Sequence, residues 1–183
     1  MKNLFCLLSI AYCLLAFPSC KQKTDYSKEI SSLDSAFVKL KEAENIFLSA
    51  DTNSFRSVYN FYQEKFHLIR KKISKDTVKK NTAVFLSDTY EQTGNLQNLL
   101  DNKKFFERAL REGRQRINDL KHDLTEDLIE KNKSAVYVIN EITASQKITA
   151  AVNRVIEKAK TAAAKLDSLK TEIVQIADSV QAQ

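Results

Sequence analysis

Proline and glycine are nearly absent from this sequence. The 183 residues contain one proline, Pro18, and two glycines, Gly94 and Gly113. Proline breaks helices, and folds made of many short strands need glycine in their tight turns. Loops that bind phosphate groups also need several closely spaced glycines. The scarcity of both residue types therefore excludes all-β folds and glycine-rich phosphate loops, and it favours long helices.

Apolar side chains recur every three or four residues through most of residues 24–183, which is the period of an amphipathic helix. The pattern predicts helices at about 26–49, 55–73, 76–92, 96–130 and 135–180. Polar or glycine-containing breaks are expected at 51–54, at 93–95 around Gly94, and at 131–134, where Ser134 would cap the last helix. We therefore predict an all-α fold: an elongated antiparallel helical bundle of four or five helices, forming a single domain over residues 26–183.

The last predicted helix, at 135–180, has the most regular pattern. Its apolar and small side chains step by alternating threes and fours, which is typical of coiled coils. At 1.5 Å per residue the helix would span about 70 Å. It would pack along the bundle, self-associate or meet a protein partner. The residues of this stripe are Val138, Ile142, Ser145, Thr149, Val152, Ile156, Ala159, Ala163, Leu166, Lys170, Ile173, Ala177 and Val180.

The stripe of residues 96–130 contains one glycine. Its later members are Ile117, Leu120, Leu124 and Leu128, and all four are expected to face the core. Gly113 falls on the same stripe, so it either allows another helix to approach closely or is a tolerated helix glycine that costs about 1 kcal/mol. The sequence alone leaves both readings open.

The first twenty residues differ from the rest of the chain. Lys2 precedes an apolar run at 4–17, which is 14 residues long. A membrane-spanning helix needs about 20 apolar residues, whereas the apolar region of a secretory signal peptide has roughly 7–15. Pro18 ends the run, and the small Ser19 precedes Cys20. This order predicts a leader that is removed by a peptidase.

The stretch Phe-Pro-Ser-Cys at 17–20 resembles the lipobox of bacterial lipoprotein signal peptides. The resemblance implies cleavage before Cys20 and attachment of two or three fatty acyl chains to it. Residues 1–19 would be the signal peptide and 20–25 a short tether. Because no aspartate follows Cys20, the resemblance also implies the outer membrane, facing the periplasm. In an organism with a single membrane, the protein would instead lie outside the cell.

The other two cysteines, Cys6 and Cys13, lie inside the predicted leader. Cleavage before Cys20 would leave a mature chain of 164 residues whose only thiol is at its amino terminus. Such a chain excludes an internal disulfide, a thiol nucleophile and a thiolate metal site.

Both histidines follow an acidic residue by three positions, as Glu64-x-x-His67 and Asp119-x-x-His122. Di-iron helical bundles use a Glu-x-x-His pair on each of two helices, with both pairs facing inward. Here each pair falls on the polar face of its predicted helix, away from the apolar stripe. These four residues are therefore weak metal-ligand candidates, and a solvated surface is the favoured interpretation. No cofactor is expected.

A cluster of arginines, Arg108, Arg111, Arg114 and Arg116, is a candidate surface for an anionic partner. Acidic residues interleave with the basic ones, and the exported address argues against nucleic acid. Serine-nucleophile motifs are missing, so we do not expect an enzyme. The sequence predicts a lipid-anchored cell-envelope protein that acts as a non-catalytic binding, spacer or scaffold module. The alternative is a helical-bundle lipoprotein that binds a small ligand or metal between its helices.

Overall fold

The computed structural model describes residues 23–72 and 79–181, and these residues are almost entirely helical. They form α2 (Ser27–Ser49), α3 (Thr52–Lys72), α4 (Lys80–Thr125), α5 (Lys131–Ser168) and α6 (Lys170–Gln181). No strand occurs in these two ranges. The all-α prediction is confirmed.

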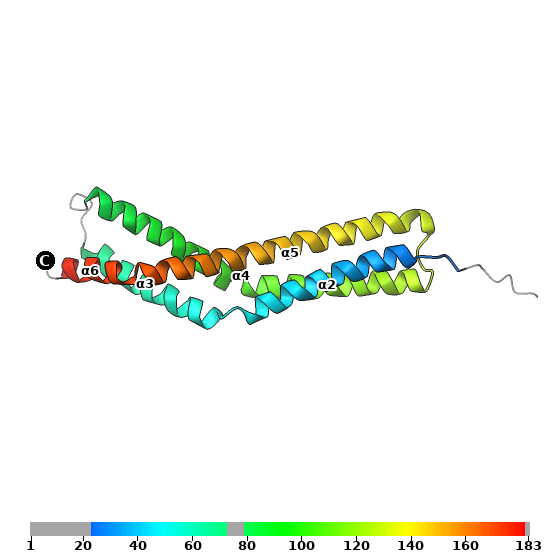
Figure 1. The fold of residues 1–183 in the computed structure, drawn as a ribbon, viewed down its shortest axis with the longest axis horizontal. Helices are drawn as coiled ribbons and strands as arrows, with labels where there is room; N and C mark the ends of the chain where they lie inside the picture. Colours follow the sequence, from blue (N-terminus) through cyan, green and yellow to red (C-terminus); the bar gives the residue numbers. More distant parts are fainter. Residues whose placement is uncertain (1–22, 73–78, 182–183) are drawn as a thin grey trace, which may run out of the picture.

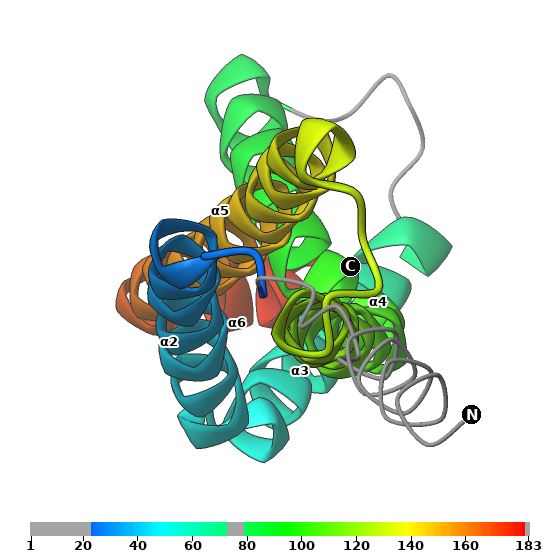
Figure 2. The same ribbon diagram turned by 90° about the vertical axis from the view of Figure 1, so that its right-hand side faces the viewer.

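The five helices form an elongated bundle with three antiparallel columns (Figure 1). The first column is α2 followed by α3, the second is α4 in the opposite direction, and the third is α5 followed by α6. Figure 2, which looks along the long axis, shows the columns grouped around a common centre. At 1.5 Å per residue, the 46 residues of α4 span about 69 Å. The predicted elongated antiparallel bundle is confirmed, whereas coiled-coil packing of the last column stays a prediction.

The core runs the length of the bundle, but different helices form it in the two halves. In the half nearer the amino terminus, α2 packs against the end of α4 and the start of α5. In the far half, α3 packs against α6, the start of α4 and the end of α5. A hydrogen bond between Lys103 Nζ and Thr52 Oγ1 (3.2 Å) marks where α4 passes the start of α3. The largest fully buried side chains include Leu33, Leu40, Tyr62, Leu96, Leu99, Leu110, Ile117, Leu124, Ile156 and Leu166.

The predicted turn between the first two helices is confirmed, but it is shorter than expected, because residues 52–54 already belong to α3. Ala50 is extended, and the side chain of Asp51 accepts a hydrogen bond from the backbone N–H of Ser54 (2.9 Å). An aspartate in this position satisfies one of the free N–H groups at a helix start. The side chain of Asp51 therefore begins α3 at Thr52.

The predicted break at Gly94 is wrong, because α4 continues through it. A glycine inside a helix costs about 1 kcal/mol relative to alanine. The flanking residues outweigh this cost: Thr93, Leu96 and Leu99 are all buried. The Thr93 hydroxyl also donates to the Tyr90 carbonyl within the helix (2.7 Å).

The helix predicted to reach residue 130 ends at Thr125 instead. Asp127 adopts a left-handed backbone with φ of 55°. Its N–H donates to the Leu124 carbonyl (3.2 Å), and the N–H of Leu128 donates to the Asp123 carbonyl (2.9 Å). These two bonds form a Schellman helix end, in which glycine is the usual left-handed residue. Aspartate also tolerates this conformation, so the break occurs without the glycine that would have revealed it.

The predicted break at 131–134 is displaced for the same reason. Because α4 already ends at Thr125, α5 begins at Lys131. Ser134 is therefore not a cap. It is buried within the first turns of α5, and its hydroxyl donates to the Lys131 carbonyl (3.0 Å).

The single helix predicted at 135–180 is divided at Leu169. Its N–H is shared between the carbonyls of Lys165 (3.2 Å) and Leu166 (3.1 Å), which tightens the backbone for one residue. The next bond, from the Ile173 N–H to the Leu169 carbonyl (3.1 Å), resumes the helical pattern. Most of the predicted stripe is buried on both sides of this point, including Val152, Leu166 and Ile173.

Gly113 is buried at a close approach between helices. A Cβ atom added there would lie 3.2 Å from Ile148 Cδ1 and 3.3 Å from Leu40 Cδ1. These distances are tighter than ordinary carbon–carbon contacts. Of the two readings left open by the sequence, the structure supports close packing of α2 and α5 on α4.

Tyr62 joins α3 to the end of α5 in the far half. Its buried hydroxyl donates to the Leu166 carbonyl, which also accepts the N–H of Leu169 (3.1 Å). Burial, with a smaller contribution from the charge of Asp167, raises the pKa of Tyr62 to about 12. The neutral phenol is thus favoured in the folded protein.

We expect the stabilisation that Tyr62 provides to be complete below pH 10 and to be lost as the pH rises towards 12. Tyr62→Phe should cost about 1 kcal/mol at pH 8, because a hydrogen bond is lost while the Leu166 carbonyl keeps a partner. Its cost should shrink at pH 11. Urea unfolding at both pH values measures this, with Tyr59→Phe on the same helix as the control. An equal cost of Tyr62→Phe at both pH values would contradict the prediction.

Candidate functional site

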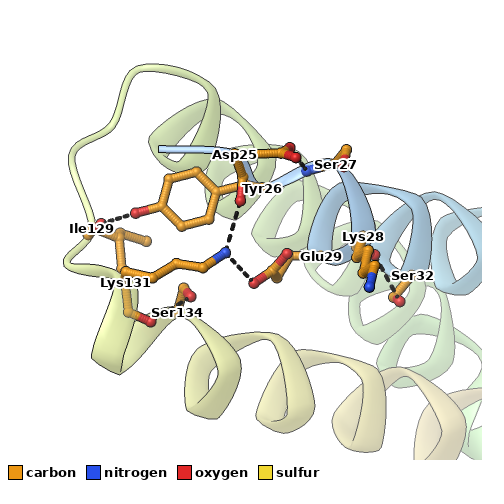
Figure 3. Close-up of polar contacts among 9 residues, drawn as sticks. All are labelled: Asp25, Tyr26, Ser27, Lys28, Glu29, Ser32, Ile129, Lys131 and Ser134. Carbon is orange, nitrogen blue, oxygen red and sulfur yellow. Dashed lines mark hydrogen bonds and ion pairs between the residues drawn. The ribbon is translucent and has the colours of Figure 1, made fainter. Parts of the chain in front are cut away.

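The start of α2 is clamped to the turn between α4 and α5 (Figure 3). The Tyr26 hydroxyl donates to the Ile129 carbonyl. Lys131 Nζ donates to the Asp25 carbonyl (2.7 Å) and to Glu29 Oε1 (2.8 Å), and it lies 4.6 Å from the centre of the Tyr26 ring. These contacts join residues more than 100 positions apart in the sequence. We call this group the tether clamp.

Hydrogen bonds favour the ionised form of the two carboxyl groups in the tether clamp. The hydrogen bond from Lys131 lowers the pKa of Glu29, and backbone and side-chain hydrogen bonds from Ser27 lower the pKa of Asp25. Lowered pKa values favour the ionised form of both carboxyl groups: that of Glu29 contacts the Lys131 ammonium, and that of Asp25 accepts from the backbone N–H of Ser27 (2.9 Å). The clamp therefore holds the backbone at residues 25–26 against the end of the bundle, and the chain leaves the bundle at that end.

The predicted lipidation residue, Cys20, lies outside the described residues. It precedes Tyr26 by six positions. Six residues of extended chain reach at most about 20 Å. Any group attached to Cys20 is thus confined to the neighbourhood of the tether clamp. Within residues 23–72 and 79–181, no helix combines the length and the apolar character that crossing a bilayer requires.

A cleft of about 330 Å³ lies between α2 and α5 in the same half of the bundle. Its size falls at the lower end of the range for small-molecule sites. Two of its oxygens, Thr149 Oγ1 and Asn153 Oδ1, are buried without a hydrogen-bond partner in the described structure. The polar side chains lining it are Ser32, Ser35 and Lys39 of α2 and Ser145, Gln146, Thr149 and Asn153 of α5.

The chemistry of this cleft suits a small molecule with hydrogen-bond donors and an apolar body. The hydroxyls of Ser35 and Ser145 donate to carbonyls of their own helices, which leaves their oxygens as acceptors. Ala36 and Ile142 supply apolar surface. The sequence placed Ser145 and Thr149 on the core stripe of their helix and did not reveal the cleft. The cleft forms because the α2 residues opposite them include the small Ser32, Ser35 and Ala36, which leave the space between the helices unfilled.

The four predicted arginines do not form one surface. Arg114 Nη2 pairs with Glu44 Oε1 of α2 (2.9 Å), and Arg116 Nε pairs with Glu141 Oε2 of α5 (3.0 Å). These two side chains tie α4 to its two neighbours. Arg108, Arg111 and Arg116 are exposed, and Arg108 Nε also lies 3.9 Å from Glu112 Oε1 of its own helix. Three of the four arginines are therefore already paired with carboxylates, which leaves little positive charge for an anionic partner.

The two acid–histidine pairs lie far apart. Glu64 and His67 are exposed on α3 in the far half, whereas Asp119 and His122 are exposed near the end of α4 that meets the tether clamp. Asp119 accepts a hydrogen bond from Gln115 of the same helix (2.7 Å). Within 23–72 and 79–181, no three His, Cys, Asp or Glu side chains gather closely enough to hold a metal ion.

The fold and the site define an elongated, antiparallel helical bundle whose amino-terminal segment is clamped at one end. Comparison with known proteins adds nothing to this description: no protein-family model, no curated protein and no solved structure matches the chain.

Proposed function

We propose that this protein is a lipid-anchored spacer or scaffold of the cell envelope, held to a membrane through Cys20 and without catalytic chemistry. The observation that carries the proposal is the tether clamp, which places the chain's exit at one end of a long rod. An anchor at the end of a rod holds the opposite end away from the membrane. With α4 spanning about 69 Å, the reach is large for a chain of this size.

The address proposed is the outer membrane, facing the periplasm. The far half, formed by α3, α6 and the start of α4, would then point away from the membrane. We propose that the last column, α5 and α6, provides the surface for a protein partner or for self-association. No nucleic acid is involved in this proposal.

A second candidate function is supported by the cleft between α2 and α5. Two buried oxygens without hydrogen-bond partners, Thr149 Oγ1 and Asn153 Oδ1, favour a bound small molecule that supplies donors. In this proposal the anchored bundle would carry that molecule rather than act only as a spacer.

Mass spectrometry of protein extracted from membranes tests both proposals. Under denaturing conditions, we expect the mass of residues 20–183 increased by two or three acyl chains. An unmodified mass, or a chain that still begins at Met1, would refute the lipid anchor. Under native conditions, a further non-covalent mass that Asn153→Leu removes would support the second candidate, and its absence would refute it.

A further inference from the structure

Four large apolar side chains are exposed around the tether clamp. The exposed fraction is 67% for Leu128, 56% for Val136, 46% for Tyr137 and 62% for Ile139. Leu128 was expected in the core, but the helix end at Thr125 places it in the turn. The other three lie in the first turns of α5. Tyr137 borders α4 and Ile139 borders α2, so the three side chains surround this end of the helix rather than share one face. We call these four residues the apolar collar.

The apolar collar and the tether lie at the same end of the rod. The clamp residues Ile129 and Lys131 fall between Leu128 and Val136 in the sequence. Ile139 is eight residues beyond the start of α5, so the collar occupies about the first 12 Å of that helix. Because the tether reaches at most about 20 Å, acyl chains on Cys20 would bring a lipid surface to the collar.

We propose that the apolar collar contacts the lipid surface that holds the acyl chains of Cys20. The inference rests on the proposed lipid anchor and names a second contact between the protein and the membrane. Amphipathic surfaces of this kind enter a membrane to a depth of about 5–10 Å, and tyrosine favours the interface between lipid and water. A second contact restricts the tilt of the rod, which attachment through Cys20 alone does not.

The charges near the collar indicate what kind of lipid contact this is. Glu130 pairs with Lys133 (3.1 Å) and Glu29 with Lys131 (2.8 Å), so these four charges compensate one another. Lys21, Lys23 and Lys28 supply three further positive charges, and Asp25, Glu126 and Asp127 supply three further negative ones. This end of the rod therefore offers no excess positive charge to anionic headgroups. The contact is apolar and does not depend on anionic lipid.

The sequence offers a direct test. Residues 20–183 contain one cysteine and no tryptophan, so the mature chain can be coupled through Cys20 to a maleimide lipid and given a single tryptophan. Tyr137→Trp places the probe in the collar. Tyr90→Trp, near the start of α4, is the matched control, because Tyr90 is 50% exposed and lies in the far half. The vesicles are zwitterionic phosphatidylcholine with bromine atoms on the acyl chains.

We expect the tryptophan of Tyr137→Trp to be quenched by the brominated lipid roughly threefold or more over the control, because it lies within the depth of interfacial insertion. The quenching should survive 0.5 M salt and disappear when Val136→Asp and Ile139→Asp are added. Val84→Asp, in the far half and 52% exposed, should leave it unchanged.

Equal quenching at both positions would overturn the proposal. A second copy of the chain that covers the collar would also overturn it. Light scattering would then show dimers in the absence of vesicles, and Val136→Asp would dissociate them. Because the lipid is attached chemically, this result does not depend on modification in the cell. An unmodified Cys20 in cells would refute the proposed anchor, whereas a collar without quenching would refute only the second contact.

Discussion

We expect Cys20→Ala to move the mature protein from the membrane fraction to the soluble fraction. One acyl chain gives only marginal membrane binding, and each buried CH₂ group contributes about 0.8 kcal/mol, so the two or three chains of the proposed anchor would provide most of the anchoring free energy. The apolar collar has four side chains and cannot replace them. The ratio of membrane-bound to soluble protein should fall by roughly a hundredfold or more, a loss of about 2.7 kcal/mol.

The measurement needs a leader that is still removed, because an uncleaved apolar segment would itself bind to membranes. Residues 17–19 are therefore replaced by an Ala-x-Ala cleavage site in the Cys20→Ala variant. Cys6→Ala and Cys13→Ala are the matched controls, since both remove a thiol from the leader and keep Cys20. If the cleaved Cys20→Ala chain sedimented with membranes as the native protein does, the anchor would have to lie elsewhere.

The helical class and the antiparallel, elongated form follow from sequence because they depend on regular spacing over long segments. The positions of the breaks depend on single residues, and these were harder to predict. Gly94 resembles a helix end, yet buried neighbours on both sides keep α4 continuous. Asp127 does not resemble one, yet it adopts the left-handed conformation that ends the helix. At Gly94, the packing of the buried neighbours outweighs the low helix propensity of glycine. At Asp127, an aspartate adopts the left-handed conformation that glycine usually provides.

The parts of the candidate site that depend on pairs of helices could not be read from one helix at a time. Nothing in the spacing of α2 shows that Tyr26 meets Ile129, 103 positions later. The cleft likewise exists because Ser32 and Ser35 of α2 lie opposite Ser145 and Thr149 of α5. Leu128 was wrongly expected in the core, because the apolar spacing of α4 continues in the sequence beyond Thr125, where the helix ends. Charge pairs such as Arg114 with Glu44 also required the packing of two helices.

We expect Leu40→Ala to lower the free energy of unfolding by about 2–5 kcal/mol, the usual cost of removing a buried leucine side chain. Leu40 is fully buried and lies against Gly113 of α4. In a chain of this size, each kcal/mol corresponds to about 2–4 °C in melting temperature. Leu48→Ala on the same helix is the matched control, because Leu48 is 63% exposed and should change stability by about 0.5 kcal/mol or less.

A double-mutant cycle then tests the close approach itself. Gly113→Ala gains about 1 kcal/mol of helix propensity, but its Cβ must displace Leu40 Cδ1 at 3.3 Å and Ile148 Cδ1 at 3.2 Å, so the single variant measures only the balance of these two effects. With Leu40→Ala present, one of these two obstacles is gone, so the effect of Gly113→Ala should become more stabilising by about 0.5 kcal/mol or more. Additive effects would mean that Leu40 and Gly113 do not touch. The register of α2 against α4, and with it the position of the tether clamp, would then be wrong.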